Sequence, residues 1–224
     1  MPLAALLQAR PSAPSRRRGG TRTQTPAQRR VLLAYIGLNA ALDVVWLLTF
    51  GRSHPGLVRE RLWPGPGAKE GFLKIFVLYG LPYLGHYILA ALDLGRCHWF
   101  RPVPLRLQLA GLIGYFGALG VAMWATAVNP FFSSAVRIQS ERGQHVITSG
   151  PYRAVRHPGY AAAIPLLISS ALALGSWAAL PPALVWVATI TRRTLLEDCL
   201  LREELAGYPR YANRVRYRLL PGVW

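Results

Sequence analysis

Charged residues are scarce in this chain, and acidic residues are the scarcest. Only 16% of its 224 residues are charged, and 9 acids stand against 26 lysines and arginines. Soluble domains carry about 25% charged residues, so the shortage excludes a water-exposed surface over most of the chain. Cysteine is also rare, and Cys97 and Cys199 each stand alone. Their isolation excludes a disulfide framework and a cysteine metal site.

The apolar residues, 52% of the total, come in long blocks. The alternation of a half-buried strand is missing. About 20 apolar residues in a helix cross a bilayer, and the blocks at 31–50, 71–94 and 105–128 reach that length. The sequence therefore predicts an all-α integral membrane protein.

A fourth apolar block, 159–191, is too long for one membrane helix and short for two. Gly175-Ser176 and Pro181-Pro182 interrupt it. We predict a tight helical hairpin of residues 159–174 and 177–191, which brings the total to about five membrane segments.

The first 30 residues contain seven arginines and no acid, and they predict a disordered basic tail. Such a start also fits an organellar transit peptide. The net charge of +17 favours anionic lipid rather than nucleic acid as a partner, because arginines flank the apolar blocks. Five segments would put the two arginine-rich ends on opposite sides, whereas the charge rule puts both inside. Either one segment does not span, or the tail breaks the rule.

Three ionisable residues fall within or beside the apolar blocks: Asp43, His86 and Asp93. Such groups are costly in lipid, so they face either a partner or a functional cavity. We favour a structural role for each of them, with Asp43 paired to a donor on a neighbouring helix and Asp93 near the membrane interface. A substrate cavity is the alternative.

Polar, rigid and aromatic residues gather in the stretch GPYRAVRHPGY at 150–160, directly before the hairpin. Pro151 and Pro158 stiffen the backbone. Arg156 offers a planar fork for an anion, and His157 and Tyr160 add ring faces. The pattern favours a small, partly anionic ligand with an aromatic part.

The polar tail 192–224 follows the hairpin, so it lies on the same side as the loop 129–158. Arg193 and Glu197 are four residues apart and share one helix face. A solvated helix with ordinary ion pairs is one interpretation. Four acids within eight residues, in a chain with only nine, favour a functional role instead.

These two constellations resemble the integral-membrane methyltransferases related to isoprenylcysteine carboxyl methyltransferase and their phospholipid-methylating relatives. The resemblance covers about residues 129–224. Its matching residues are His145, Val146, Gly150, Tyr152, the run from Arg156 to Tyr160, Arg193, Glu197, Asp198, Leu201, Tyr208, Tyr211 and Val215. Asp198 departs from the usual Glu, and we expect the shorter side chain to weaken its contact.

The resemblance implies a methyltransferase that uses S-adenosylmethionine without a Rossmann domain, and the chain has no GxGxxG. It implies a lipid or lipid-linked acceptor and a bacterial cell membrane, with the active site facing the cytoplasm. With the segments predicted from composition, the chain divides into the tail 1–30, three membrane helices in 31–128 and, by the resemblance, a catalytic region in 129–224. The implied cofactor-binding residues are His145, Val146, Gly150, Tyr152, Arg156, His157, Tyr160 and Glu197. The implied catalytic residues are Arg156, His157 and Arg193, with no metal.

Two other interpretations fit the same residues. Membrane sterol and enone reductases, which use NADPH, look similar over the C-terminal region, but they often have Asn where this chain has Gly159, and an acid commonly follows the tyrosine where Ala161 stands here. A non-enzymatic lipid-binding protein would use the motif only as an anchor at the membrane interface.

Overall fold

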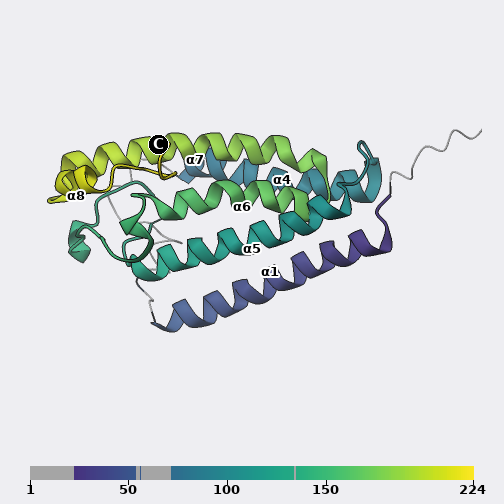
Figure 1. Ribbon diagram of the computed structural model, residues 1–224, viewed down its shortest axis with the longest axis horizontal. Coiled ribbons are helices and arrows are strands. Elements are labelled where there is room, and N and C mark those ends of the chain that lie inside the picture. The colour runs from purple at the N-terminus through teal and green to yellow at the C-terminus, as the bar shows by residue number, and fades with distance from the viewer. Residues whose placement is uncertain (1–22, 54–55, 57–71, 134) are drawn as a thin grey trace, which may run out of the picture.

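The computed structural model describes residues 23–53, 56, 72–133 and 135–224, and these residues form helices and loops without a strand (Figure 1). Most of the predicted basic tail, and residue 71 of the second predicted segment, lie outside the described residues. The helices are α1 (Pro26–Ser53), α3 (Phe72–Ile75), α4 (Leu81–Leu92), α5 (Leu105–Val128), α6 (Pro158–Leu174), α7 (Leu180–Glu204) and α8 (Tyr208–Arg214). The all-α prediction is confirmed for this part of the chain.

Helix α1 begins at Pro26, earlier than the predicted start at 31. The amide of Thr25 donates to Oε1 of Gln28 at 2.8 Å, and the amide of Gln28 donates to the Thr25 hydroxyl at 3.3 Å. This reciprocal capping box satisfies two amides that a helix start leaves unpaired. The cap, rather than the first apolar residue, therefore sets the helix start, and residues 26–30 are helical.

Three helices are long and apolar enough to cross a membrane: Pro26–Thr49, Leu73–Cys97 and Leu105–Val128. They coincide with the first three predicted segments, and α5 has the predicted bounds. The second runs from α3 into α4 through a π-helical turn at Phe76–Gly80 and ends in another at Asp93–Cys97. Large apolar side chains point outward, as in Ile113, which is 75% exposed. The chain is therefore an integral membrane protein.

The predicted hairpin is formed by α6 and α7, which turn at Gly175–Ala179. Helix α6 is a shorter apolar helix than the three candidate spans. Helix α7 continues beyond the predicted end at 191 and reaches Glu204. Residues 192–204 contain neither glycine nor proline and are rich in strong helix formers, so nothing ends the helix where the apolar run ends. Glu197 and Asp198 consequently stand on a rigid helix.

Helices α5 and α6 pack against each other at very short range. A Cβ atom on Gly111 would lie 2.6 Å from Cβ of Leu172 and 2.7 Å from the carbonyl oxygen of Ser169. Only glycine permits this approach, which is typical of packed membrane helices. The packing fixes α6 against α5, and α8 and the loop 129–158 gather at the end where α6 begins (Figure 1).

His86 and Asp93 are structural residues of the bundle, as favoured from the sequence. His86 is fully buried, and its ring nitrogens lie 3.1 Å from the Ala179 carbonyl oxygen and 2.7 Å from the Ser170 hydroxyl. The Asp93 carboxylate accepts from the Ser176 hydroxyl at 2.6 Å and from the Phe100 amide at 3.1 Å. Asp43 instead faces a cavity of about 700 Å³ between α1 and α4.

Candidate active site

A pocket lies where the loop 129–158 meets α6, the second half of α7 and α8. Its enclosed volume is about 60 Å³. The walls combine aromatic rings with polar and charged side chains. The lining residues are Asn129, Phe131, Phe132, Ser133, Gln144, His145, Val146, Ile147, Tyr152, Arg156, His157, Gly159, Tyr160, Glu197, Leu201, Leu205, Tyr208 and Tyr211.

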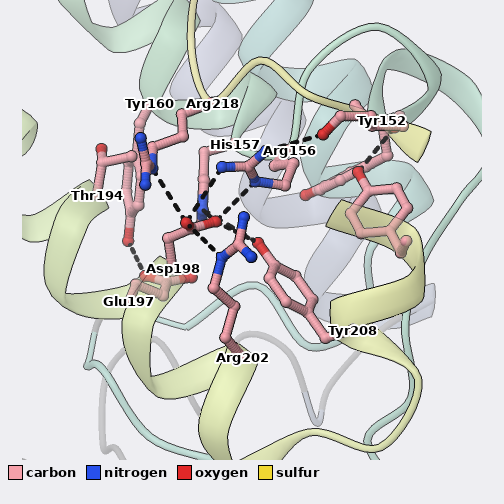
Figure 2. Close-up of polar contacts among 12 residues, drawn as sticks. Tyr152, Arg156, His157, Tyr160, Thr194, Glu197, Asp198, Arg202, Tyr208 and Arg218 are labelled. Atoms are coloured by element: carbon pink, nitrogen blue, oxygen red, sulfur yellow. Dashed lines mark hydrogen bonds and ion pairs between the residues drawn. The ribbon is translucent and has the colours of Figure 1, made fainter. Parts of the chain in front are cut away.

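Asp198, on α7, is the centre of the polar contacts behind this pocket (Figure 2). Its carboxylate accepts hydrogen bonds or ion pairs from five side chains and is 1% exposed. Two of these side chains also line the pocket: the Tyr208 hydroxyl lies 2.9 Å from the carboxylate, and Nε2 of His157 lies 3.4 Å from it. The three cations are Arg156 at 2.7 and 3.1 Å, Arg202 at 3.2 Å and Arg218 at 3.0 Å.

These contacts keep Asp198 ionised. Burial alone would raise the pKa of the carboxyl group, but hydrogen bonds from His157, Arg156 and Tyr208 outweigh it and lower the pKa well below 3.8. The expectation that the shorter Asp198 side chain weakens its contact does not fit this geometry, because the carboxylate is satisfied from every side. In turn, burial and the nearby Asp198 charge raise the pKa of Tyr208.

The side chain of Arg156 makes its hydrogen bonds to other groups of the protein. Its Nε and Nη2 bind both oxygens of Asp198, and Nη1 donates to the carbonyl oxygens of Val215 at 2.8 Å and Arg216 at 2.7 Å. The amides of Arg156 and His157 donate to the carbonyl oxygens of Tyr217 and Arg218, each at 2.9 Å. Arg156 thus fastens the C-terminal segment to α7, and only part of its side chain borders the pocket.

Glu197, next to Asp198, has a different set of partners. The Tyr160 hydroxyl donates to Oε2 of Glu197 at 2.6 Å and accepts from Nε of Arg193 at 2.8 Å. The guanidinium of Arg193 also lies 5.1 Å from the centre of the Tyr79 ring. The predicted shared face of Arg193 and Glu197 is confirmed, since both meet the same hydroxyl from consecutive turns of α7.

Most of the residues predicted to bind a cofactor border the pocket. These are His145, Val146, Tyr152, Arg156, His157, Tyr160 and Glu197. His145 is exposed, and its ring meets Phe131 edge-on at 5.1 Å between centres. The His157 and Tyr160 rings are stacked, with centres 5.9 Å apart and planes 13° apart.

Gly150 and Arg193, by contrast, do not line the pocket. Gly150 has φ of +56°, and a Cβ atom there would lie 3.0 Å from Val128. Its position lets the loop turn tightly against the end of α5. Arg193 lies one hydrogen bond further back, behind Tyr160.

Several lining residues had no role in the sequence analysis. Nδ2 of Asn129 donates to the Tyr152 hydroxyl at 2.9 Å, and the Tyr211 hydroxyl donates to the Tyr152 carbonyl oxygen at 2.8 Å. The Phe132 ring covers Gly159, where a Cβ atom would lie 2.6 Å from that ring. For Tyr208 and Tyr211, the resemblance to the methyltransferase family is the sequence feature that points to the site.

Residues 107–206, from the first turn of α5 to the end of α7 and the turn after it, match the family model of phospholipid methyltransferases. This segment belongs to the family of integral-membrane methyltransferases that includes the isoprenylcysteine carboxyl and phospholipid methyltransferases. The methyltransferase segment contains every site residue predicted from the sequence, whereas Tyr208, Tyr211 and Arg218 lie beyond its end. Comparison with curated proteins gave no significant match.

Proposed function

We propose that the chain transfers a methyl group from S-adenosylmethionine to a lipid or lipid-linked acceptor, at a carboxylate or an amine. The observation that carries the proposal is the hydrogen bond between Tyr160 and Glu197, which joins the two sequence constellations in one pocket. The pocket lies at the mouth of the apolar hairpin, within the segment matched to the methyltransferase family.

The pocket has the chemical groups that this methyl donor requires. Aromatic faces attract cations, and the rings of Tyr152, Tyr160 and Tyr208 border the cavity. The carboxylate of Glu197 is half-buried and suits an ammonium or a ribose hydroxyl. When bound, the donor supplies an electrophilic methyl group. The protein contributes alignment and exclusion of water, which supply much of the acceleration of a displacement reaction.

The contacts divide the predicted residues by role. Glu197, Tyr160 and His157 present groups to the cavity, and we assign them to ligand contact. We assign Arg156 and Arg193 to positioning: Arg156 holds the C-terminal segment, and Arg193 orients the Tyr160 hydroxyl. His145, Val146 and Tyr152 complete the wall.

The enclosed volume of about 60 Å³ is well below the roughly 300 Å³ at which small-molecule sites begin. Part of the wall must therefore move when the donor binds. Phe132 is the best placed, because its ring rests on the glycine backbone at Gly159. We expect Phe132→Ala to increase the association rate of the donor.

We expect the acceptor to reach this pocket from the bilayer, since the pocket lies where the apolar helix α5 ends and the apolar helix α6 begins. A carboxylate acceptor attacks without loss of a proton, whereas an ammonium must first lose one. His157 borders the pocket, but its Nε2 already faces Asp198 and Tyr208, each at 3.4 Å. This geometry favours ligand positioning by His157 over general-base catalysis.

Ligand-dependent thermal unfolding of the purified protein in detergent tests the proposal. S-adenosylmethionine should raise the midpoint, and NADPH should leave it unchanged. Arg193→Lys should weaken donor binding, whereas Arg210→Lys, an exposed control on α8, should have no effect. Stabilisation by NADPH alone would replace the methyltransferase with the reductase interpretation.

We also propose that α6 and α7 complete five membrane segments and that the pocket faces the cytoplasm. The two exposed cysteines lie near opposite ends of the bundle: Cys97 ends the turn that Asp93 joins to Ser176 of the hairpin, and Cys199 follows Asp198 near the end of α7. A membrane-impermeant maleimide should label Cys97 in intact cells and Cys199 only after permeabilisation. The hydrogen bond from Cys199 to Glu203 raises the pKa of the Cys199 thiol. Because the thiolate is the form that reacts, labelling needs a mildly alkaline buffer. The reverse pattern would overturn this orientation.

A further inference from the structure

Two partly exposed arginines meet at one oxygen atom beside the pocket. Nε of Arg202, on α7, and Nε of Arg218, in the C-terminal segment, both donate to Oδ2 of Asp198, at 3.2 and 3.0 Å. Figure 2 shows the two side chains approaching the carboxylate from different elements. Two guanidinium groups that share one acceptor atom must lie next to each other, although they repel.

The charges in this group do not balance. The contacts of Asp198 and of Glu197 with Tyr160 join two carboxylates to four arginines, namely Arg156, Arg193, Arg202 and Arg218. The group therefore has a net charge of +2. The guanidinium of Arg156 is hydrogen-bonded to Asp198 and to backbone carbonyl oxygens, and Arg193 is buried behind Tyr160. The excess charge falls on Arg202 and Arg218.

These two arginines still have hydrogen-bonding capacity. Their side chains are 40% and 30% exposed, respectively. Within the described part of the chain, each makes hydrogen bonds through Nε alone. The Nη groups remain available to a ligand. Arg218 is further held by the Trp224 ring, whose centre lies 5.4 Å from its guanidinium carbon.

We propose that Arg202 and Arg218 form a binding site for a phosphate group. Two planar forks braced by a shared carboxylate can grip different edges of a tetrahedral anion. A charge of +2 matches a phosphate better than a lone carboxylate. Neither arginine lines the cavity, so the site is separate from the one assigned to the methyl donor, which carries no phosphate.

The position of the site allows two sources of phosphate. Arg202 lies nine residues beyond Arg193, which contacts Tyr160 in the first turn of α6, and this separation is about two and a half turns or roughly 13.5 Å along α7. If α6 begins at the edge of the hydrocarbon, the backbone of Arg202 lies beyond the lipid headgroups, which extend only about 5–8 Å from that edge. A lipid phosphate then reaches the site only where the long arginine side chains extend back to the headgroup layer. A soluble phosphate reaches it without restriction. The chemistry of recognition is the same for both.

Calorimetry in maltoside micelles, which contain no phosphate, tests the site without a methyl donor. The probes are dihexanoyl phosphatidylglycerol, dihexanoylglycerol as its phosphate-free counterpart, and inorganic phosphate. We expect binding of the phospholipid and none of dihexanoylglycerol. Binding of inorganic phosphate with equal affinity would identify a soluble phosphate as the ligand, and weaker binding would identify the lipid.

The variant R202Q/R218Q should weaken phosphate binding at least tenfold. R210Q removes an exposed arginine outside the group and should change it less than twofold. Equal loss in both variants would show a bulk charge effect and overturn the proposal, as would the absence of binding by either phosphate-bearing probe. If R202Q/R218Q does not fold, R202K/R218K decides: it keeps the charge without the fork, so unchanged affinity overturns the site and a severalfold loss supports it.

Discussion

Polar side chains are buried at both ends of the α6–α7 hairpin, but their hydrogen-bond partners differ between the two ends. At the end where α6 begins, Asp198 is surrounded by three arginines. At the other end, the partners of the buried side chains are neutral: His86 lies between Ser170 and a backbone carbonyl, and the Asp93 carboxylate accepts from a hydroxyl and an amide. Both ends are buried and hydrogen-bonded, but only one concentrates ions.

The difference follows from what each end faces. Within the bilayer, an ion has no water to stabilise it, so neutral hydrogen bonds are the less costly way to join helices. At the pocket end, α7 continues past its apolar part into the charged residues 192–204, where a paired charge costs less than in an apolar surrounding. Paired charges there hold three separate segments, the loop, α7 and the C-terminal residues, in one arrangement. The ionic end should therefore govern binding, and the neutral end should govern stability alone.

Loss of Asp198 should have the largest effect. Asp198→Ala leaves three arginines without their shared anion, and removing one partner of a buried ion pair costs about 3–5 kcal/mol. We expect the C-terminal segment to detach from α7 and donor binding to disappear. Hydrogen exchange of residues 215–220, together with calorimetry, measures both. Glu203→Ala, an exposed acid on the same helix, is the control and should leave both unchanged.

Glu197→Gln should separate binding from stability. Gln has nearly the same shape but no charge, so the free energy of unfolding should change by less than about 1 kcal/mol. Affinity for S-adenosylmethionine should fall at least tenfold, because the pocket loses its half-buried anion. Calorimetry and denaturant unfolding on the same preparation decide. Equal affinity in variant and wild type would remove Glu197 from the site.

Ser170→Ala tests the neutral end. Its hydroxyl lies 2.7 Å from both His86 Nε2 and the Tyr35 hydroxyl, so both lose a partner. Leaving buried polar groups unpaired costs about 1–3 kcal/mol, with no change in donor affinity. Thr189→Val removes a hydroxyl that bonds only within its own helix and should cost less. A loss of donor affinity in Ser170→Ala would show that the ends are coupled.

The smallest effect is expected from acid. The pKa of Asp198 is lower in the folded protein than its ordinary 3.8, so its stabilising contribution is present above that value and is lost as pH falls through the folded value. The stability of the pocket end should therefore stay constant from pH 7 to about 4. Thermal unfolding across this range measures it. A loss centred near pH 5 that Asp198→Asn abolishes would contradict the pKa direction.

The sequence predicts the helices better than the site. Apolar length locates α5 with its observed bounds, and four-residue spacing predicts the shared face of Arg193 and Glu197. The partners of Arg156 could not be predicted, because Asp198 and the carbonyl of Val215 are 42 and 59 residues away and only tertiary packing brings them together. From the sequence, Arg156 is therefore predicted only as a ligand-binding residue, and its contacts in the structure add a second role. The same holds for Phe132, whose contact with Gly159 depends on the path of a loop.

The central claim is that the pocket between the loop, α7 and α8 holds the methyl donor. Ultraviolet cross-linking of methyl-labelled S-adenosylmethionine, followed by peptide mapping, tests it most directly. The account predicts label on peptides from residues 129–160 or 197–211, and competition by unlabelled donor. Label confined to the cavity between α1 and α4, or no specific label on folded protein, would contradict it.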